Sequence, residues 1–183
     1  LLARLSSGFH GGIHGPLITT LGAEPDWSKD RLKSILFGNS VPDIYGDPWG
    51  GGISKGHLIV GNLTVLSHLL GTKHQPNFKK SILIIEDIGE APYRIDRMLT
   101  HLRLAGILQQ LSGLGFGSFT SCDNDKDVDK KKSFELFDIF RDRTKDLNIP
   151  IISNLPIGHC LGNAALPQGS QAIINGDKGR LSV

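Results

Sequence analysis

One stretch of this 183-residue chain, from Ser81 to Leu108, constrains the possible folds more than any other. It opens with the apolar run Ile82–Ile85, which has the length and the β-branched content of a buried strand. The sequence then turns polar, and Pro92 stands where a helix can begin. The apolar residues that follow at helical spacing are Ile95, Met98, Leu99 and Leu102. The stretch therefore predicts a buried strand that leads into an amphipathic helix.

The predicted strand ends in a cluster of acidic residues, Glu86, Asp87 and Glu90. In an α/β protein, the carboxyl end of a buried strand commonly carries residues that bind or react with a ligand. A carboxylate at such a place can also cap the next helix or lie in a solvated turn. The residue types alone favour helix capping or a solvated turn. The cluster is therefore a candidate functional site, with this structural role as the simpler alternative.

The composition is that of an ordinary globular protein, with 39% hydrophobic and 21% charged residues. A chain of this length can bury a sizeable core and holds one domain, or one and a fraction. The formal net charge is only +2 and the cationic residues are dispersed, which argues against a nucleic-acid surface. No apolar run approaches the about 20 residues that span a bilayer, and no signal peptide is visible.

The two cysteines, Cys122 and Cys160, lie far apart and form no Cys-x-x-Cys pair. Together with the 23 glycines, this favours a protein of tight turns without disulfides. We therefore expect a reducing, cytoplasmic compartment. The chain begins at Leu1–Leu5 without an initiating Met and resembles the tail of a helix from a longer protein, so a targeting segment could have been removed with it.

Other segments complete an irregular alternation of strands and helices. A short helix is predicted after Trp27, with Asp26 or Ser28 as its N-cap. The residues expected to face inward from this helix are Leu32, Ile35 and Leu36. The remaining predicted elements are a strand at His57–Val60, a helix at Leu63–Leu70 capped by Asn62, a strand at Leu114–Phe119, a helix capped by Ser133, a strand at Ile149–Ser153, and a hairpin of Gln171–Asn175 with Arg180–Val183.

Two segments have the composition of loops. Residues 38–55 are rich in Gly and Pro, including Gly50–Gly52, and are predicted to be a linker between domains. They contain neither a phosphate-binding loop nor a dinucleotide fingerprint. Residues 123–132 alternate in charge and are predicted to be a solvated surface loop, because their aspartates lack the glycine and the glutamate of a calcium loop.

The histidines offer a second set of candidates. His159 follows a glycine in a loop beyond the predicted strand Ile149–Ser153, where the fold could hold its ring within reach of a ligand. A carboxylate such as Glu86 and a histidine form two thirds of a hydrolytic triad, but no serine here lies in a Gly-x-Ser-x-Gly elbow. His10 and His14 have the spacing of metal ligands on a helix, yet the glycines around them argue against a helix.

Several segments together resemble a known family. They are Gly61–Thr64 with Gly71 and Thr72, Ile84–Leu99, Leu155–His159 and Leu166–Gly169. In these motifs the chain, from about Gly11 to its end, is similar to the C-terminal part of the LD-carboxypeptidases, the serine peptidases of family S66. That family includes murein tetrapeptide carboxypeptidases and microcin C immunity peptidases.

The resemblance implies a Ser-Glu-His triad in which Glu86 matches the catalytic glutamate and His159 the catalytic histidine. The family's nucleophilic serine lies in a Gly-x-Ser-Asp turn, expected here just upstream of Leu1. The element His14-Gly15-Pro16 matches a His-Gly-Pro element that leads out of the nucleophile domain. Substrate-binding residues stay unassigned, and the resemblance implies neither a metal nor another cofactor.

The resemblance also implies a fold. We expect an α/β chain: the swivelling β/α C-terminal domain of a two-domain LD-carboxypeptidase, preceded by the tail of its N-terminal Rossmann-like domain. The expected boundaries are residues 1–37 for the tail of the nucleophile domain, 38–55 for the linker and 56–183 for the C-terminal domain.

The implied reaction is hydrolysis of the amide before a terminal D-amino acid in muropeptides, during cytoplasmic peptidoglycan recycling. The expected partner is a muropeptide or another small peptide, with no nucleic acid and no membrane. A homodimer is an open possibility, because loss of the N-terminal domain would expose an apolar face. The alternatives are a microcin C-type peptidase for peptidyl-nucleotides, a catalytically silent fragment without a nucleophile, and, least favoured, a metal hydrolase using Glu86, Asp87, Glu90 and His159.

Overall fold

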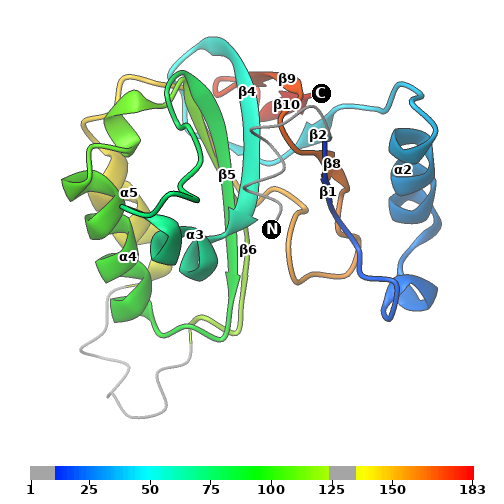
Figure 1. The fold of residues 1–183 in the computed structure, drawn as a ribbon, viewed down its shortest axis with the longest axis horizontal. Helices are drawn as coiled ribbons and strands as arrows, with labels where there is room; N and C mark the ends of the chain where they lie inside the picture. The colour runs from blue at the N-terminus through cyan, green and yellow to red at the C-terminus, as the bar shows by residue number, and fades with distance from the viewer. Residues whose placement is uncertain (1–10, 124–134) are drawn as a thin grey trace.

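The computed structural model describes residues 11–123 and 135–183. Within these residues, a mixed sheet of eight strands forms the centre of the fold and helices cover one of its faces (Figure 1). The strands are β1 (Ile13–His14), β2 (Ile44–Tyr45), β3 (Asp47–Pro48), β4 (Ile53–Asn62), β5 (Ser81–Ile88), β6 (Gly113–Thr120), β7 (Ile151–Ser153), β8 (Leu166–Pro167), β9 (Gln171–Asn175) and β10 (Arg180–Ser182). The helices are α2 (Asp26–Leu36), α3 (Leu63–Leu69), α4 (Pro92–Leu104) and α5 (Leu136–Thr144), with short 3₁₀ turns at Leu21–Ala23 and Leu108–Gln110. The α/β class expected from the sequence is confirmed.

The large sheet has the strand order β2-β10-β9-β4-β5-β6-β7-β3. Its centre, β4 to β7, is parallel, and the other pairings are antiparallel. Parallel strands end at the same edge of a sheet, so the last residues of β4 and β5 are brought together: Asn62 lies opposite Glu86. The sheet thus places the predicted acidic strand end beside the start of α3.

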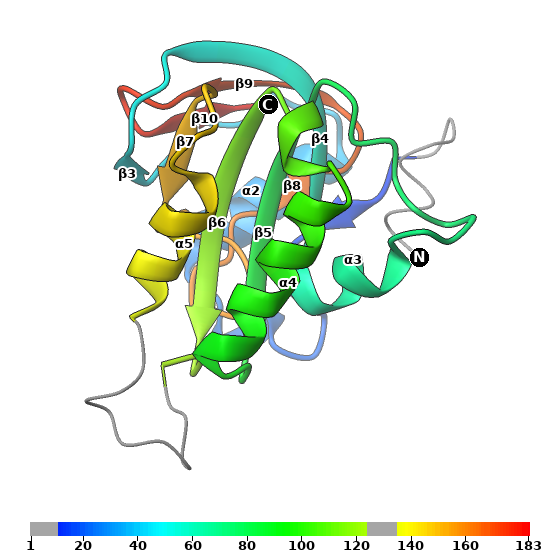
Figure 2. The ribbon, with the colours of Figure 1, turned by 90° about the vertical axis from the view of Figure 1, so that its left-hand side faces the viewer.

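The two edge strands of this sheet, β2 and β3, are separated in the chain by Gly46 alone. A side chain at Gly46 would collide with the carbonyl oxygen of Ser153, 2.1 Å from the position of a Cβ atom. Because strands at opposite edges are so close in sequence, the sheet must curl, and β4 bends across the end of the molecule toward β9 (Figure 2). The segment 38–55, predicted as a linker, therefore contributes both edges of the sheet.

Helices α3, α4 and α5 pack on the outer face of the curled sheet (Figure 2). Helix α4 begins at Pro92 as predicted, and Ile95, Leu99 and Leu102 are completely buried against the sheet. Each such side chain gains about 1.5–3 kcal/mol from burial. Met98 lies at the margin of this core and is only partly buried. The strand and helix predicted from the opening stretch are confirmed.

The other face of the sheet encloses a second apolar core. This core contains residues of β4, β5, β7, β9 and β10 together with the segment after β7; among its members are Leu58, Ile84, Ile152, Leu155 and Ile174. Strand β8 contributes Leu166 to this core, while β1 pairs with β8 and α2 lies farther from the sheet (Figure 1). The predicted C-terminal hairpin is present, since β9 and β10 pair antiparallel.

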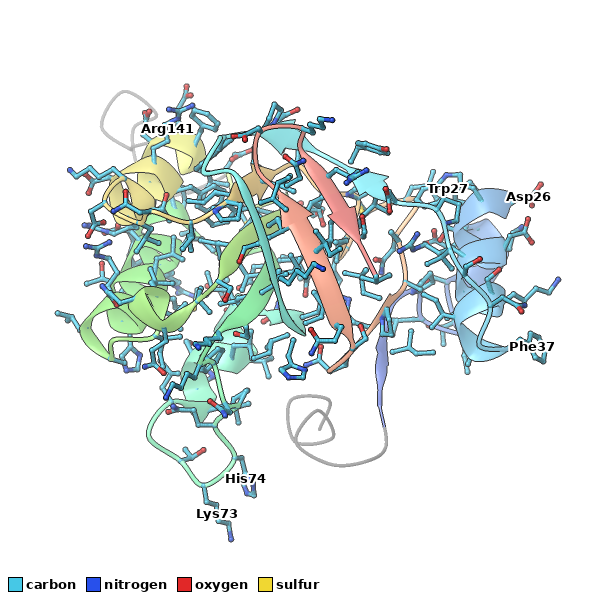
Figure 3. All side chains as sticks on the ribbon, turned by 90° about the horizontal axis from the view of Figure 1, so that it is seen from above. Asp26, Trp27, Phe37, Lys73, His74 and Arg141 are labelled. Carbon is cyan, nitrogen blue, oxygen red and sulfur yellow. The ribbon has the colours of Figure 1, made fainter. Side chains whose placement is uncertain are left out.

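Helix α2 differs from its prediction. It begins at Asp26 with Pro25 at the N-cap position, and neither Asp26 nor Ser28 caps it. Leu36, expected to face inward, is 63% exposed, and Phe37 at the end of the helix also points to solvent (Figure 3). The residues of this helix that are buried are polar, Ser28 and Arg31.

The reason lies in what α2 packs against. The hydroxyl of Ser28 donates to the carbonyl of Asn163 at 2.7 Å, and Arg31 Nε donates to the carbonyl of Ala165 at 2.8 Å. The helix therefore docks on backbone carbonyls that require donors. Of the three residues expected to face inward, Leu32 and Ile35 are partly buried and Leu36 is exposed. A periodicity argument assumes an apolar partner and fails here.

Two features of the prediction fall partly or wholly outside the described residues. Ser133, predicted to cap a helix, lies outside the described residues. So does the charged segment 123–132, apart from Asp123. Helix α5 is described from Leu136, with Glu135 at its N-cap position. Among the helices that the structure describes, none is long and apolar enough to cross a membrane.

Candidate active site

The fold brings Glu86 and His159 into direct contact. Nδ1 of His159 lies 2.7 Å from Oε2 of Glu86, a short distance that indicates a charge-assisted hydrogen bond. The glutamate is only 1% exposed, whereas the imidazole side chain is 44% exposed. Because Nδ1 faces the carboxylate, Nε2 points the opposite way and can exchange a proton with another group. The two residues singled out in the sequence thus form a buried acid with an accessible base.

Two glycines make room for the Glu86 side chain. A Cβ atom at Gly158 would lie 2.6 Å from Oε2 of Glu86, and one at Gly117 would lie 3.2 Å from its Cβ. Gly158 also adopts a φ of +110°, which side chains with a Cβ rarely accept. The residue before the histidine is therefore a glycine for two reasons, space for the acid and backbone conformation.

A second histidine approaches the same carboxylate. Nε2 of His14, on β1, lies 3.8 Å from Oε1 of Glu86. The His14 side chain is largely buried, and its Nδ1 has no hydrogen-bond partner among the described residues. Glu86 therefore sits between two imidazoles, one at each oxygen. His10, the other histidine of the possible metal pair, lies outside the described residues.

The surroundings of Glu86 act on its pKa in opposite directions. Burial raises the pKa, but His14 and His159 lower it, and the net effect is a pKa below the ordinary value. The carboxylate is therefore charged at neutral pH. A charged acid buried beside an imidazole can fix the ring's tautomer and stabilise its protonated form.

The loop that carries His159 is held at several points. The side-chain oxygen of Asn163 accepts from the backbone N–H of Gly158 at 3.1 Å. Oε2 of Glu24 accepts from the backbone N–H groups of Gly162 and Asn163, at 2.9 and 3.1 Å. Glu24 is itself buried, and its pairing with these donors accounts for a carboxylate in the interior. No local sequence pattern marks Glu24, because its partners come from a distant loop.

The other acids of the predicted strand end have local roles. Asp87 accepts from the amide nitrogen of Asn62 at 2.7 Å and from both N–H and hydroxyl of Thr64, at 2.9 and 2.8 Å. It therefore holds the first turn of α3, whose N-cap is Asn62. Glu90 pairs with Arg94 at 3.3 Å across one turn of α4. The acidic cluster thus divides into one residue at the site and two that stabilise helices.

A cavity of about 630 Å³ contains the pair. Its lining comes from the segment Ile13–Glu24, from the loop Gly158–Asn163, which carries His159, and from Glu86. Its rim carries apolar side chains that are exposed in this chain, Leu17, Ile18 and Leu161. The cavity is thus open to solvent and flanked by apolar surface.

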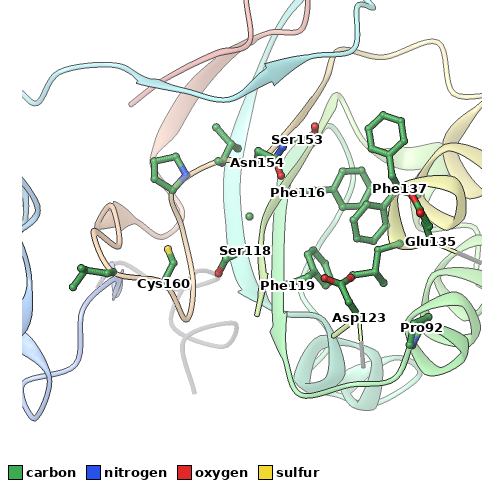
Figure 4. Close-up of a pocket in the computed structure, with 16 residues that line it drawn as sticks. Pro92, Phe116, Ser118, Phe119, Asp123, Glu135, Phe137, Ser153, Asn154 and Cys160 are labelled. Atoms are coloured by element: carbon green, nitrogen blue, oxygen red, sulfur yellow. The ribbon is translucent and has the colours of Figure 1, made fainter. Parts of the chain in front are cut away.

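A second cavity, of about 820 Å³, shares Cys160 and Leu161 with the first (Figure 4). Ser118 and Cys160 line one side of it, and the rings of Phe116, Phe119 and Phe137 line the other. Burial raises the pKa of the Cys160 thiol, so this group is protonated at neutral pH and is a weak nucleophile. Neither Glu86 nor His159 lines this cavity, so the chemistry of the pair belongs to the smaller one.

Comparison with known proteins gives a consistent picture. The model of the LD-carboxypeptidase C-terminal domain matches residues 55–174. A protein of Synechocystis sp. named as a carboxypeptidase is 45% identical over 170 residues, which are 93% of this chain and 56% of that protein. The murein tetrapeptide carboxypeptidase of Pseudomonas aeruginosa is 34% identical over 195 residues, covering 97% of this chain and 61% of the enzyme.

Solved structures share the fold. The muramoyltetrapeptide carboxypeptidase of Oxalobacter formigenes superposes with a TM-score of 0.84 at 27% identity, covering 98% of this chain and 62% of that one. The microcin C7 self immunity protein MccF superposes with a TM-score of 0.80 at 20% identity, covering 100% and 63%. At that identity the likeness to MccF concerns the fold alone. The chain spans between half and two thirds of the length of each of these proteins.

Proposed function

Since the chain belongs to the LD-carboxypeptidase family, peptidase family S66, and corresponds to its C-terminal portion, we propose that it supplies the glutamate and the histidine of a Ser-Glu-His triad. The observation that carries this proposal is the 2.7 Å contact between Glu86 and His159 inside a solvent-open cavity. The lowered pKa of Glu86 supports it, because an orienting acid must stay charged.

In the proposed mechanism, Nε2 of His159 takes the proton of the serine hydroxyl as its oxygen attacks the scissile carbonyl carbon. Glu86 stabilises the imidazolium that forms. The tetrahedral intermediate then collapses, the C–N bond breaks, and the imidazolium gives its proton to the leaving amine. Water then attacks the carbonyl carbon of the acyl-enzyme while His159 takes its proton. The ester C–O bond breaks, and the imidazolium returns the proton to the serine oxygen.

The serine and the backbone donors for the oxyanion are expected in the part of the relatives that this chain does not span. We propose the boundaries 1–37 for the tail of the nucleophile domain, 38–55 for the connecting segment and 56–183 for the C-terminal domain. The connecting segment is not a free linker, because its strands β2 and β3 pair with β10 and β7 of the C-terminal sheet. The family match, which begins at residue 55, supports the last boundary. The exposed Leu17, Ile18 and Leu161 beside the cavity are where the N-terminal portion would pack.

The proposed substrate is a muropeptide that ends in a D-amino acid, and the proposed process is peptidoglycan recycling. The names of the relatives from P. aeruginosa and O. formigenes support this substrate. Cys122 and Cys160 are free thiols, which is compatible with the reducing, cytoplasmic location that we propose. A homodimer stays a prediction, to be tested by light scattering on the purified protein.

The substrate is tested with the full-length protein and two compounds, a murein tetrapeptide and a peptidyl-nucleotide of the microcin type. We expect release of terminal D-alanine from the tetrapeptide with the higher kcat/KM. Preferential cleavage of the peptidyl-nucleotide would overturn the substrate and keep the triad. Absence of hydrolysis with either compound would favour a catalytically silent protein.

A further inference from the structure

Each oxygen of Glu86 faces a different imidazole. Oε2 contacts Nδ1 of His159 at 2.7 Å, and Oε1 faces Nε2 of His14 at 3.8 Å. We infer that His14 is a positioning residue, which holds the second oxygen of Glu86 and so fixes the plane of the carboxylate presented to His159. This inference rests on the proposed function, since it assigns the residue that aligns the proposed triad acid.

The need for a second contact follows from the freedom of a glutamate side chain. Its last torsion, between sp³ and sp² carbons, is broad and has no sharp staggered minimum. A carboxylate held through one oxygen can therefore turn about that contact and misdirect the imidazole it orients. A donor at the other oxygen removes this freedom.

The surroundings of His14 fit this role. Strand β1 pairs with β8, where His14 lies opposite Leu166, so the backbone of the histidine is fixed. Its ring is largely buried, and Nδ1 has no other polar partner among the described residues. The Nε2 edge faces Glu86, so the tautomer that suits the site carries its proton on Nε2. No nearby group in the described part of the chain competes for this imidazole.

The 3.8 Å separation is longer than a hydrogen bond, which requires about 2.7–3.2 Å. A movement of less than about 1 Å would close it, and catalytic contacts that are long in the free protein often shorten when substrate binds. The segment Ile13–Glu24 is itself a wall of the cavity. An occupant that presses on this wall can therefore bring His14 onto Oε1.

Electrostatics agree with the geometry. His14 and His159 together lower the pKa of Glu86 against its burial. The other titratable groups that line this cavity are Glu24, which is held by backbone N–H groups, and Cys160, whose pKa is raised by burial. Neither offers Glu86 a cation or a strong donor. His14 is therefore the group whose removal should change the titration of Glu86 without touching His159.

The test uses three variants of the full-length protein. His14→Phe removes the donor and keeps a ring, His14→Gln keeps a donor, and His101→Phe makes the same replacement at an exposed position of α4. Glu86 is followed by ¹³C NMR of its labelled carboxyl carbon during a pH titration, with Glu86→Gln to assign the signal. The pH dependence of kcat and KM on murein tetrapeptide is measured in parallel.

We expect His14→Phe to shift the titration of Glu86 upward and to lower kcat by about tenfold to a hundredfold with little change in KM. His14→Gln should stay close to the wild type, and His101→Phe should equal it. The inference is overturned if the Glu86 titration is the same in all variants. It is also overturned if Gln and Phe lower activity equally, since that indicates a packing role only.

The NMR arm does not depend on turnover. If the wild-type protein fails to cleave any peptide, the proposed function fails, and the titration still decides whether His14 acts on Glu86. If His14→Phe does not fold, His14→Leu takes its place with the same expected shift.

Discussion

The carboxylate of Glu86 lies 2.7 Å from Nδ1 of His159, although the two residues are 73 positions apart in the chain. Strand β5 places the acid at the edge of the parallel sheet, and the loop after β7 brings the histidine over it. Because both are fixed by this portion of the chain, the proposed acid and base are preassembled. In the proposed triad, only the serine remains to be positioned against Nε2 of His159.

The first prediction concerns Gly158, where a side chain would meet the carboxylate of Glu86 and where φ is +110°. Gly158→Ala should displace Glu86 or His159 and lower kcat by about a hundredfold, since a misplacement of about 1 Å costs that much. Stability should fall by about 1–3 kcal/mol from backbone strain. Steady-state kinetics and urea unfolding measure the two effects.

Gly71 is the matched control for this substitution. It has a φ of +74° but open space around it. Gly71→Ala should therefore strain the backbone and lower stability while leaving kcat unchanged. If both variants lower kcat alike, the proposed clash with Glu86 is wrong.

The second prediction concerns Glu24, which accepts two backbone N–H groups from the loop that carries His159. Glu24→Ala leaves these donors unpaired in the interior and should cost about 1–3 kcal/mol of stability. Activity should fall as well, because the loop can move relative to Glu86. Glu24→Gln keeps an acceptor oxygen and should recover much of both quantities.

Asp30→Ala, at an exposed position on α2, controls for loss of an acid in the same region. Differential scanning calorimetry and kinetics on the three variants decide the matter. A Glu24→Ala variant as stable and as active as Asp30→Ala would contradict the role of Glu24.

The third prediction concerns pH. The pKa of Glu86 in the folded protein lies below its ordinary value of 4.5. As the pH falls, the unfolded state therefore binds a proton before the folded state does. The stability contributed by the charged acid is fully present above the pKa of the unfolded state, and it is lost as the pH falls through the pKa of the folded state. The difference in free energy of unfolding between wild type and Glu86→Gln should be constant near neutral pH and shrink below about pH 4.5.

Urea unfolding of both proteins across the acid range measures this difference. Subtraction of the two curves removes the contribution of the other carboxylates. A difference that grows on acidification would mean that the pKa of Glu86 is raised in the folded state.

The sequence predicted well those elements whose signals are local. Strand β5 was predicted from a run of four branched apolar residues, and helix α4 from apolar residues that recur every 3.6 positions. Both patterns lie within a few residues and indicate which side chains are buried. Asn62 was correctly expected to cap α3, since its side chain accepts from the N–H of Val65. The pairing of Glu86 with His159 came from the family resemblance, because composition alone left the acidic strand end more suited to capping.

What the sequence did not predict depends on distant partners. Helix α2 buries Ser28 and Arg31 because the backbone at Asn163 and Ala165 needs donors, and no local pattern reports that need. Glu24 and His14 contact residues far along the chain, so neither was assigned to the site by spacing. Strands β2 and β3 have only two residues each and lie in a segment rich in glycine and proline. They form because strands β10 and β7 offer edges with which they can pair.

The proposed triad is tested most directly by kcat of the full-length protein on a murein tetrapeptide, measured for Glu86→Gln, His159→Ala and the double variant, with His101→Ala as control. Each single variant should lower kcat by about 10³- to 10⁴-fold, and the double variant should lose little more, because the residues act as one unit. Full activity in either single variant, or losses that multiply in the double variant, would contradict a triad built on Glu86 and His159.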